Sequence, residues 1–389
     1  MVVLHLRKEY GENLVSNVMR KGQGAYGRRW RGVRRAMAEG RMHALLVTHL
    51  PDVRWLCGFT GSNAALAVTA KQAVLFTDGR YTAQAREETR GARVKIAEKS
   101  ALRECCALLE KQAGQARFEQ VGFDPEHTSV AALELMRSGV SAGKRRGFFV
   151  ALKKPLISAL RMVKDEGELA LLTKAADLGC RLFEEMLPRI ESGMSEVRFA
   201  AELEFLARGL GAEGMSFETI VASGARSALP HGRATAAKMP RKGFVTLDFG
   251  VILNGYCSDM TRTVHLGRAN GEERAAYDAV LEAQEAAAAA VKAGVTCGAV
   301  DKAAREVLEK AGWGKYFTHS TGHGVGIEIH EQPRLAAGQE MRLEAGMVVT
   351  IEPGVYLPGK FGIRIEDMVA VTKSGSRNLT PVTKSWIEL

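Results

Sequence analysis

The sequence predicts two domains, an α/β domain followed by an α+β domain that holds the candidate site. A chain of 389 residues with 46% hydrophobic content is long enough to bury two cores. Apolar strand candidates and helical periodicity alternate in the first part of the chain. A basic, proline-containing segment near Pro155 then indicates a boundary. We therefore expect the first domain to end at residue 157 and the second to occupy residues 158–389.

The first domain shows two strands and two helices. Apolar runs at residues 44–48 and 73–77 are typical of buried strands, because each is short and rich in β-branched or aromatic residues. Helical periodicity appears at residues 31–39 and 81–90. This order is typical of an α/β fold.

The second domain begins with a helix that Asp165 can cap and that runs toward Pro188. Two more helices are predicted farther along, one at residues 273–292 that Gly294 terminates and one at residues 300–310. Strands with acidic residues alternate with these helices, which indicates an α+β domain with its site on the sheet.

One hairpin is centred on Asn254 and Gly255. Two β-rich runs flank this dipeptide, which favours a type I′ turn. If Leu253 pairs with Tyr256, then Asp259 lies opposite Gly250, on the sheet face of Asp248. The two carboxylates become diagonal neighbours about 7–8 Å apart at the backbone, and Gly250 is expected to leave the space between them open.

A second pair of carboxylates, Glu352 and Glu366, lies on two later strand candidates. Arg364 and Glu366 share one face by the period-two rule, whereas Ile363 and Ile365 share the other. The polar face can line a site and the apolar face a core. His323, in a glycine-rich segment, adds one nitrogen donor.

Four carboxylates and one imidazole form an oxygen-rich donor set that favours Mn²⁺, Fe²⁺, Co²⁺ or Zn²⁺ without choosing among them. Most acidic residues are solvated or salt-bridged, so any one of these could be a surface group. All five in strand contexts indicate a metal site. The candidate ligands are Asp248, Asp259, His323, Glu352 and Glu366.

The motifs around these residues resemble the metallopeptidase family of prolidase, aminopeptidase P and methionine aminopeptidase. The resemblance implies the pita-bread fold for the second domain. The motifs are Leu-Pro-His-Gly at 229–232, Leu-Asp-Phe-Gly at 247–250, Tyr-Cys-Ser-Asp-Met-Thr-Arg-Thr at 256–263, His-Ser-Thr-Gly-His-Gly-Val-Gly-Ile-Glu-Ile-His-Glu at 319–331, Ile-Glu-Pro-Gly-Val-Tyr at 351–356 and Gly-Ile-Arg-Ile-Glu-Asp at 362–367.

Two motifs of the first domain, at residues 58–63 and 76–81, look like the creatinase/prolidase N-terminal domain of the proline-specific branch. Methionine aminopeptidases lack that domain. The match starts near residue 27, so we expect an unassigned extension at residues 1–26, which could be a wrongly assigned start, a flexible leader or an extra helix.

The resemblance also implies roles. The five candidate ligands hold two divalent cations, Mn²⁺ first with Co²⁺ or Zn²⁺ as alternatives, about 3.5–4 Å apart with a hydroxide between them. Glu352 doubles as general base. His330 stabilises the tetrahedral intermediate, a contribution of about 2.7–4 kcal/mol. His231 and His319 hold the substrate, and Arg364 belongs to the proline-side pocket.

The remaining histidines have no comparable sequence context. We interpret them as structural or exposed. They are His5, His43, His49, His127 and His265.

The predicted function is hydrolysis of the Xaa-Pro bond at the N-terminus of peptides, the reaction of an Xaa-Pro aminopeptidase. The alternative is an Xaa-Pro dipeptidase, or prolidase, restricted to dipeptides. A creatinase-like hydrolase is disfavoured because such relatives lack the metal carboxylates. A non-catalytic binding protein is disfavoured because all five ligands are present.

Composition sets the remaining expectations. The net charge of +10 lies mostly in basic clusters of the first domain, which we interpret as solvated surface, with no nucleic-acid partner. The six cysteines show no Cys-x-x-Cys spacing, and no apolar run is long enough to span a bilayer. We expect a cytoplasmic enzyme without a membrane partner. By resemblance, we expect a homodimer or tetramer.

Overall fold

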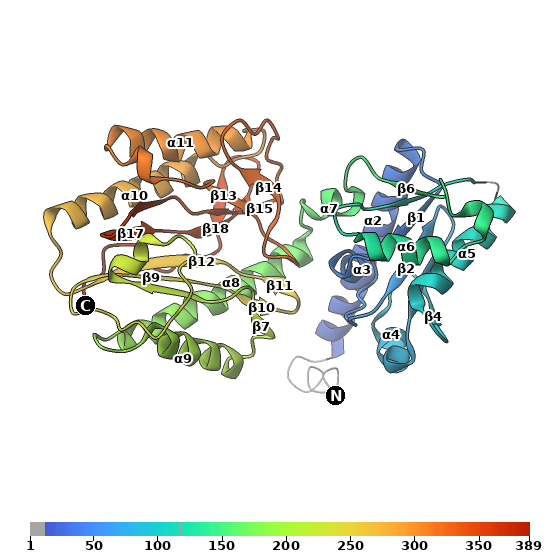
Figure 1. Cartoon of the computed structure of the whole chain (residues 1–389), viewed down its shortest axis with the longest axis horizontal. Helices are drawn as coiled ribbons and strands as arrows, with labels where there is room; N and C mark the ends of the chain where they lie inside the picture. Colours follow the sequence, from blue (N-terminus) through green and yellow to red (C-terminus); the bar gives the residue numbers. More distant parts are fainter. Residues whose placement is uncertain (1–11, 117) are drawn as a thin grey trace. The chain divides into compact units, whose positions relative to one another are not determined.

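The structure, a computed structural model, describes residues 12–116 and 118–389. The chain forms two compact units, one that ends at Arg161 and one that runs from Met162 to Leu389 (Figure 1). The helix α2 (Glu12–Glu39) continues through the expected limit at residue 26, and residues 1–11 of the expected extension lie outside the described residues. The domain limits expected from the sequence remain predictions.

The first unit is built on a six-stranded mixed sheet with the order β4-β3-β2-β1-β5-β6. β1 pairs in parallel with β5 and antiparallel with β2. The predicted runs at 44–48 and 73–77 are β1 and β3, which confirms both strands. The strands are β1 (Ala44–Val47), β2 (Ala65–Thr69), β3 (Ala73–Thr77), β4 (Arg93–Ile96), β5 (Val121–Phe123) and β6 (Phe149–Ala151).

Helices pack on this sheet, so the unit has the α/β class that the sequence predicts. Cys105 and Leu109 of α5 are buried in the same core as Leu46 and Phe76 of the strands. The predicted helix at 81–90 is α4. The remaining helices of the unit are α3 (Leu50–Cys57), α4 (Thr82–Glu88), α5 (Ala101–Ala116), α6 (Val130–Ser138) and α7 (Leu156–Arg161).

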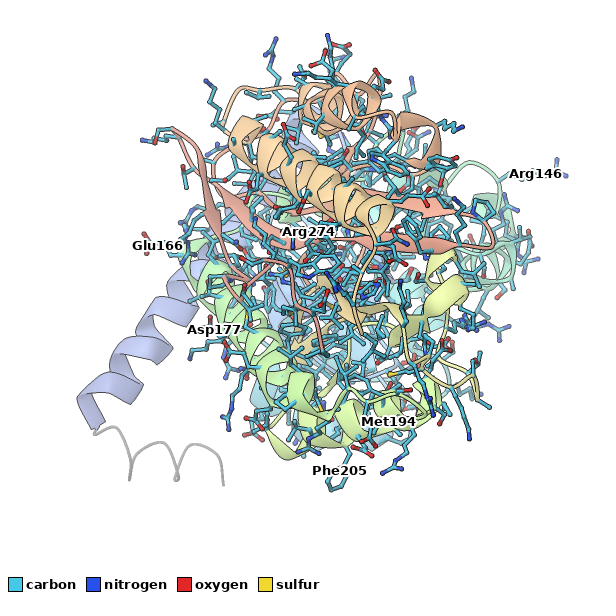
Figure 2. All side chains as sticks on the ribbon, turned by 90° about the vertical axis from the view of Figure 1, so that its left-hand side faces the viewer. Arg146, Glu166, Asp177, Met194, Phe205 and Arg274 are labelled. Atoms are coloured by element: carbon cyan, nitrogen blue, oxygen red, sulfur yellow. The ribbon has the colours of Figure 1, made fainter. Side chains whose placement is uncertain are left out.

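In the second unit, Asp165 caps the N-terminus of α8 (Glu166–Met186), as predicted. The Asp165 side chain accepts from the Glu168 amide and Glu168 accepts in return from the Asp165 amide, a capping box that satisfies two free amides of the first turn. The side chains of Glu166 and Asp177 are exposed and point away from the helix (Figure 2), whereas Leu172 is buried.

Three further helices complete the second unit. They are α9 (Glu196–Gly209), α10 (Gly271–Ala290) and α11 (Cys297–Lys310). The predicted helices at 273–292 and 300–310 are α10 and α11. α10 ends before Gly294, which has a positive φ of 90° and donates its amide to the Leu343 carbonyl. Among the described helices, none has the length and apolar composition needed to cross a bilayer.

Two main sheets lie between the helix pairs, with α10 and α11 on one side and α8 and α9 on the other (Figure 1). Their orders are β12-β9-β8 and β14-β13-β15-β18-β19, and a bridge between Thr261 and Glu366 joins them. The strands are β8 (Ile220–Ser223), β9 (Gly243–Phe249), β12 (Met260–Leu266), β13 (Gly322–Gly324), β14 (Glu331–Leu335), β15 (Val348–Ile351), β18 (Asp367–Val371) and β19 (Ser376–Asn378).

Short strands form two smaller sheets in this unit. β7, β10 and β11 form a three-stranded sheet, and β16 and β17 form a hairpin. Their bounds are β7 (Gly214–Met215), β10 (Val251–Leu253), β11 (Tyr256–Cys257), β16 (Gly354–Leu357) and β17 (Phe361–Arg364). Layers of helices around a central sheet system give the α+β class that the sequence predicts.

Candidate metal centre

The hairpin around Asn254 has the predicted register, because Leu253 pairs with Tyr256. Asn254 and Gly255 have φ values of 50° and 75°, the two positive values that a type I′ turn requires. The same register continues along β9 and β12, where Asp248 lies opposite Thr261. Asp259 is therefore the diagonal neighbour of Asp248.

The expected open space at Gly250 is absent. A Cβ atom at this position would lie 1.8 Å from the carbonyl oxygen of Ser258, so the backbone of the partner strand fills the space. Glycine is required here because the two strands of the hairpin approach each other closely. The missing side chain of Gly250 therefore does not create open space beside the carboxylates.

Glu352 and Glu366 lie just beyond the last pair of the β15–β18 ladder, Ile351 with Asp367. The Glu366 amide donates to the carbonyl of Thr261, the residue opposite Asp248. The two predicted pairs of carboxylates therefore meet across adjacent strands. The Thr261 hydroxyl donates to Glu366 Oε2 at 2.7 Å, a contact that the sequence analysis did not identify.

His323 reaches this cluster from β13. Its Nδ1 donates to the Gly324 carbonyl at 3.0 Å, which places the proton on Nδ1 and directs Nε2 toward the acids. Nε2 lies 3.5 Å from Asp259 Oδ2 and 3.5 Å from Glu352 Oε1. Donor atoms of Asp259, His323 and Glu366 all lie within 4.8 Å of one another.

The structure therefore brings three of the five predicted ligands into one compact group and keeps the other two beside it. Glu352 contacts His323, as above, and accepts from the Thr350 hydroxyl at 3.2 Å. Asp248 directs Oδ2 toward Arg364 Nη2 at 2.6 Å. With Glu366, which accepts from the Thr261 hydroxyl, three of the four acids are thus held by side-chain donors of the protein.

The acids of the cluster repel one another. Burial, followed by the charges of Glu366, Asp248 and Glu352, raises the pKa of Asp259 well above its usual range. Burial, followed by the charges of Glu352 and Asp248, raises the pKa of Glu366 well above its usual range. Burial raises the pKa of Glu352 to about 7, against the opposing charge of Arg364. Like charges in a desolvated cluster disfavour ionisation.

A divalent cation fits this donor set. Buried carboxylates whose mutual repulsion raises their pKa values are stabilised in the ionised form by a cation, and hard oxygen donors with one imidazole suit first-row divalent ions. Asp259, His323 and Glu366 offer a common position, and Glu352 and Asp248 lie beside it.

His330 and His319 lie near the acids. The His330 ring is edge-on to the His323 ring, with centroids 4.4 Å apart, and burial lowers the pKa of His330. His319 donates from Nδ1 to the Ser320 carbonyl at 2.8 Å and accepts at Nε2 from the Tyr356 hydroxyl at 2.9 Å. Burial lowers the pKa of His319 to about 4, so this ring is neutral near pH 7.

Arg364 is almost fully engaged by the protein. Its side chain is 4% exposed. Its guanidinium donates to four acceptors, which are Thr261 Oγ1 at 3.1 Å, the Pro230 carbonyl at 3.0 Å, the Tyr356 hydroxyl at 2.7 Å and Asp248 Oδ2 at 2.6 Å. Its geometry supports contact with Asp248, and its predicted place in the proline-side pocket stays a prediction.

His231 lies on the loop after the short helix η4 (Gly224–Ala228), and its side chain is exposed. Its charge adds to the factors that lower the pKa values of both His319 and His330, after burial as the main cause. Thr261 and Tyr356 also contact the site, although neither was predicted from the sequence. Both lie within the quoted motifs, and period-two spacing from Asp259 could have placed Thr261 on the site face.

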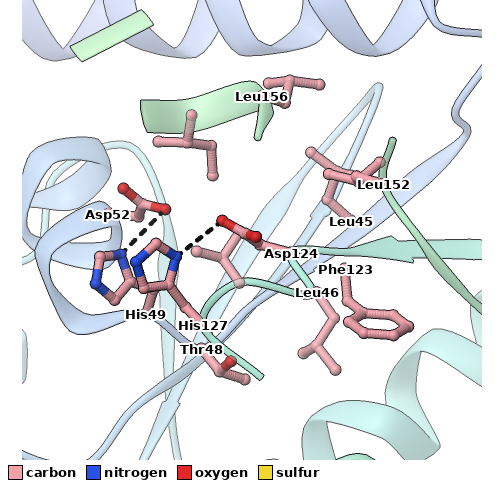
Figure 3. Close-up of a pocket in the computed structure, with 12 residues that line it drawn as sticks. Leu45, Leu46, Thr48, His49, Asp52, Phe123, Asp124, His127, Leu152 and Leu156 are labelled. Carbon is pink, nitrogen blue, oxygen red and sulfur yellow. Dashed lines mark hydrogen bonds and ion pairs between the residues drawn. The ribbon is translucent and has the colours of Figure 1, made fainter. Parts of the chain in front are cut away.

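The first unit has a separate pocket at the carboxyl ends of β1 and β5 (Figure 3). The rings of His49 and His127 stack there with centroids 3.7 Å apart. Their Nδ1 atoms lie 3.4 Å from Asp52 Oδ2 and 3.0 Å from Asp124 Oδ2 respectively. None of the predicted site residues is among those that line this pocket.

Each of these two rings lies beside a carboxylate, and our interpretation of both histidines as structural or exposed stays a prediction. Of the other histidines without a motif, His43 is exposed and His265 is buried, whereas His5 lies outside the described residues.

Comparison with known proteins places this geometry in context. A model of metallopeptidase family M24 matches residues 170–373, and a model of the creatinase/prolidase N-terminal domain matches residues 29–163. The chain is 44% identical to an Xaa-Pro dipeptidase of Pyrococcus furiosus over 275 residues, which cover 70% of this chain and 79% of that protein.

Solved structures show the same similarity. An Xaa-Pro dipeptidase from Bacillus anthracis superposes with a TM-score of 0.88 at 36% identity, over 94% of this chain and all of that one. An X-Pro aminopeptidase from Thermotoga maritima superposes with a TM-score of 0.82 at 35% identity, over 92% of this chain and 99% of that one.

Proposed function

Because this chain belongs to metallopeptidase family M24, with a creatinase-type N-terminal domain and a pita-bread catalytic domain, we propose that it is an Xaa-Pro dipeptidase. The family and the fold class expected from the motifs are confirmed. The chain is a metallopeptidase, and its family works with divalent metal ions.

The sequence alone favours an Xaa-Pro aminopeptidase and leaves the Xaa-Pro dipeptidase as the alternative. The relatives named as Xaa-Pro dipeptidases support the alternative, at 44% sequence identity and at a TM-score of 0.88. The substrate class is therefore a dipeptide with proline at its second position.

The observation that carries the chemistry is the group formed by Asp259, His323 and Glu366, with Glu352 in contact with His323. We assign the five predicted ligands to two divalent cations, Mn²⁺ first. When bound, such cations supply Lewis acidity that polarises the substrate carbonyl and makes water a nucleophile near neutral pH.

Glu352 takes the proton of the attacking water and passes it to the proline nitrogen. A carboxylate beside the attacking water can accept its proton and then release that proton to the leaving nitrogen. The contact of Glu352 with the Thr350 hydroxyl at 3.2 Å orients the carboxylate for this transfer.

The histidines act on the substrate. His330, whose pKa is lowered by burial, is a neutral ring with one N–H that can donate to the developing oxyanion. His231, exposed at the edge of the cluster, and His319 hold the substrate around the scissile bond. Arg364 orients the Asp248 carboxylate by donating to its Oδ2.

The test is hydrolysis of Ala-Pro, Ala-Pro-Ala and Ala-Ala-Ala by metal-stripped protein, before and after addition of Mn²⁺, Co²⁺ or Zn²⁺. We expect metal-dependent cleavage of Ala-Pro alone. Cleavage of Ala-Pro-Ala as well would restore the aminopeptidase, and absence of cleavage by the metal-loaded protein would overturn the proposal. Glu352→Gln is the control for contaminating peptidases. A cytoplasmic location, a homodimer or tetramer, and the absence of a nucleic-acid partner stay predictions.

A further inference from the structure

Glu196 is a fully buried carboxylate outside the metal cluster. It is the first residue of α9, shown in green in Figure 1, and its side chain is inaccessible to solvent. Burial of an unpaired carboxylate is costly, so this position requires several donors. The helix N-terminus provides a favourable field for the negative charge.

The donors to Glu196 come from both ends of one loop, residues 223–235, which we call the histidine loop because it carries His231. Oε1 accepts from the Ser223 amide and hydroxyl, both at 2.9 Å. Oε2 accepts from the Thr235 amide at 3.2 Å and from its hydroxyl at 2.9 Å. One carboxylate therefore ties the first residue of the loop to the last.

Arg226, inside the loop, adds a third connection. Its Nε lies 3.0 Å from Glu196 Oε2, and its Nη2 donates to the Arg233 carbonyl at 2.7 Å. The ion pair thus links Glu196 to the loop interior and, through Arg226, to the segment directly after His231.

The other side of the histidine loop lies against the metal-site strands. The Pro230 carbonyl accepts from Arg364 Nη1, and the Ser227 hydroxyl accepts from the Gly362 amide at 2.8 Å. A Cβ at Gly362 would lie 2.1 Å from the Ser227 carbonyl oxygen, so loop and strand are in close contact. His231 directly follows Pro230, which is tied to Arg364, and precedes Thr235, which is tied to Glu196.

We propose that Glu196 is a positioning residue for substrate binding, which holds the histidine loop closed so that His231 meets the substrate. The proposal rests on the function proposed above and deepens it. A loop whose ends share one acceptor has few conformations, so little entropy is lost when substrate binds. Without the carboxylate, that ordering cost falls on the binding step.

Glu196→Gln tests this with little change of shape. The amide nitrogen of Gln cannot accept from the Ser223 or Thr235 backbone amide, so one end of the loop loses its acceptor whichever way the amide turns. We expect the KM for Ala-Pro to rise about tenfold, the size that loss of a hydrogen bond to a charged group gives. The kcat and the Mn²⁺ affinity measured by calorimetry should stay within about twofold.

Glu204→Gln is the matched control. Glu204 lies on the same helix and accepts from the Thr219 hydroxyl at 2.7 Å, outside the histidine loop. We expect an unchanged KM. Hydrogen exchange supplies a readout apart from activity, because the amides of residues 223–235 should exchange faster in Glu196→Gln and at the wild-type rate in Glu204→Gln.

Thr235→Val, which removes one exposed donor to Glu196, keeps the test decisive if Glu196→Gln does not fold. It should raise KM in the same direction by a smaller factor. An unchanged KM in whichever of these variants folds, or a loss of metal affinity parallel to the loss of activity, would overturn the positioning role. A wild type that cleaves no Xaa-Pro dipeptide would instead overturn the proposed function.

Discussion

Glu366 and Asp367 are adjacent in sequence and lie in opposite electrostatic environments. Asp367 accepts from Arg262 Nη2 at 2.7 Å and from Lys384 Nζ at 2.9 Å. Three neutral donors complete its shell, from Gln284, Asn378 and Thr380. Glu366, on the other face, accepts from the Thr261 hydroxyl and faces other acids.

The difference shows that two adjacent acids can have different roles, one in stabilising the fold and one in binding a metal ion. Side chains alternate between faces, so consecutive acids point into different surroundings. The charge of Asp367 is neutralised by Arg262 and Lys384 of the protein, whereas Glu366 lies among other acids, whose negative charge a metal ion can neutralise. Arg262 contacts both residues, because its Nη1 also donates to the backbone carbonyl of Glu366.

The largest expected effect is that of Glu366→Gln. Loss of this carboxylate removes one member of the compact donor group, so we expect turnover to fall by about three orders of magnitude or more, together with loss of bound metal. Metal content by elemental analysis and kcat for Ala-Pro are the measurements. Full metal occupancy in the folded variant would show that Glu366 is not needed to bind the metal ions, which would contradict its contrast with Asp367.

Asp367→Ala should act on stability. It leaves Arg262, which is 2% exposed, without its buried ionic partner, and breaking such a pair costs about 3–5 kcal/mol. Denaturant unfolding measures the loss. Asp278→Ala, which breaks an exposed pair with Arg274, is the control and should cost about 0.3–0.5 kcal/mol. Equal losses in the two variants would contradict the assignment.

His330→Ala sharpens the distinction between metal binding and chemistry. The ring lies beside His323 and outside the compact donor group. We expect kcat to fall by about 10²–10³, the effect of losing one donor to the oxyanion, while metal content stays at the wild-type level. A kcat close to that of wild type would remove His330 from the transition state.

The smallest expected effect concerns pH. Burial raises the pKa of Glu352 to about 7 from its ordinary value of 4.5. In metal-free protein its contribution to stability is therefore present below pH 4.5 and is lost as the pH rises to about 7. Glu352→Gln cannot titrate at this position. Relative to this variant, the melting temperature of metal-free wild type should fall by a few degrees across that range.

A constant difference in melting temperature between wild type and Glu352→Gln from pH 4.5 to 7 would contradict this prediction. Added Mn²⁺ is expected to reduce the pH dependence, because a bound cation favours the ionised carboxylate.

Much of the site was predictable because it depends on local chemistry. The turn at Asn254–Gly255 sets the register of the hairpin, and that register makes Asp248 and Asp259 diagonal neighbours. Asp165 begins α8 because a short acidic side chain can accept from the first free amides of a helix. These outcomes require only a few consecutive residues.

Other features could not be predicted because they need partners far away in the chain. The partners of Arg364, the Pro230 carbonyl and Asp248 Oδ2, lie more than 100 residues earlier in the chain, and no local pattern around Arg364 indicates them. The space at Gly250 was misjudged because the backbone of the facing strand occupies it.

The sequence by itself determined the donor types, the alternation of faces, the turn at Asn254–Gly255 and the cap of α8, because these follow from side-chain chemistry and backbone geometry over a few residues. Only the tertiary structure decided which buried carboxylates lack a cationic partner from the protein and which have one. The cations that neutralise Asp367, and the donors that gather on Glu196, come from elements separated in sequence, and a buried charge is set by all the groups that surround it in space.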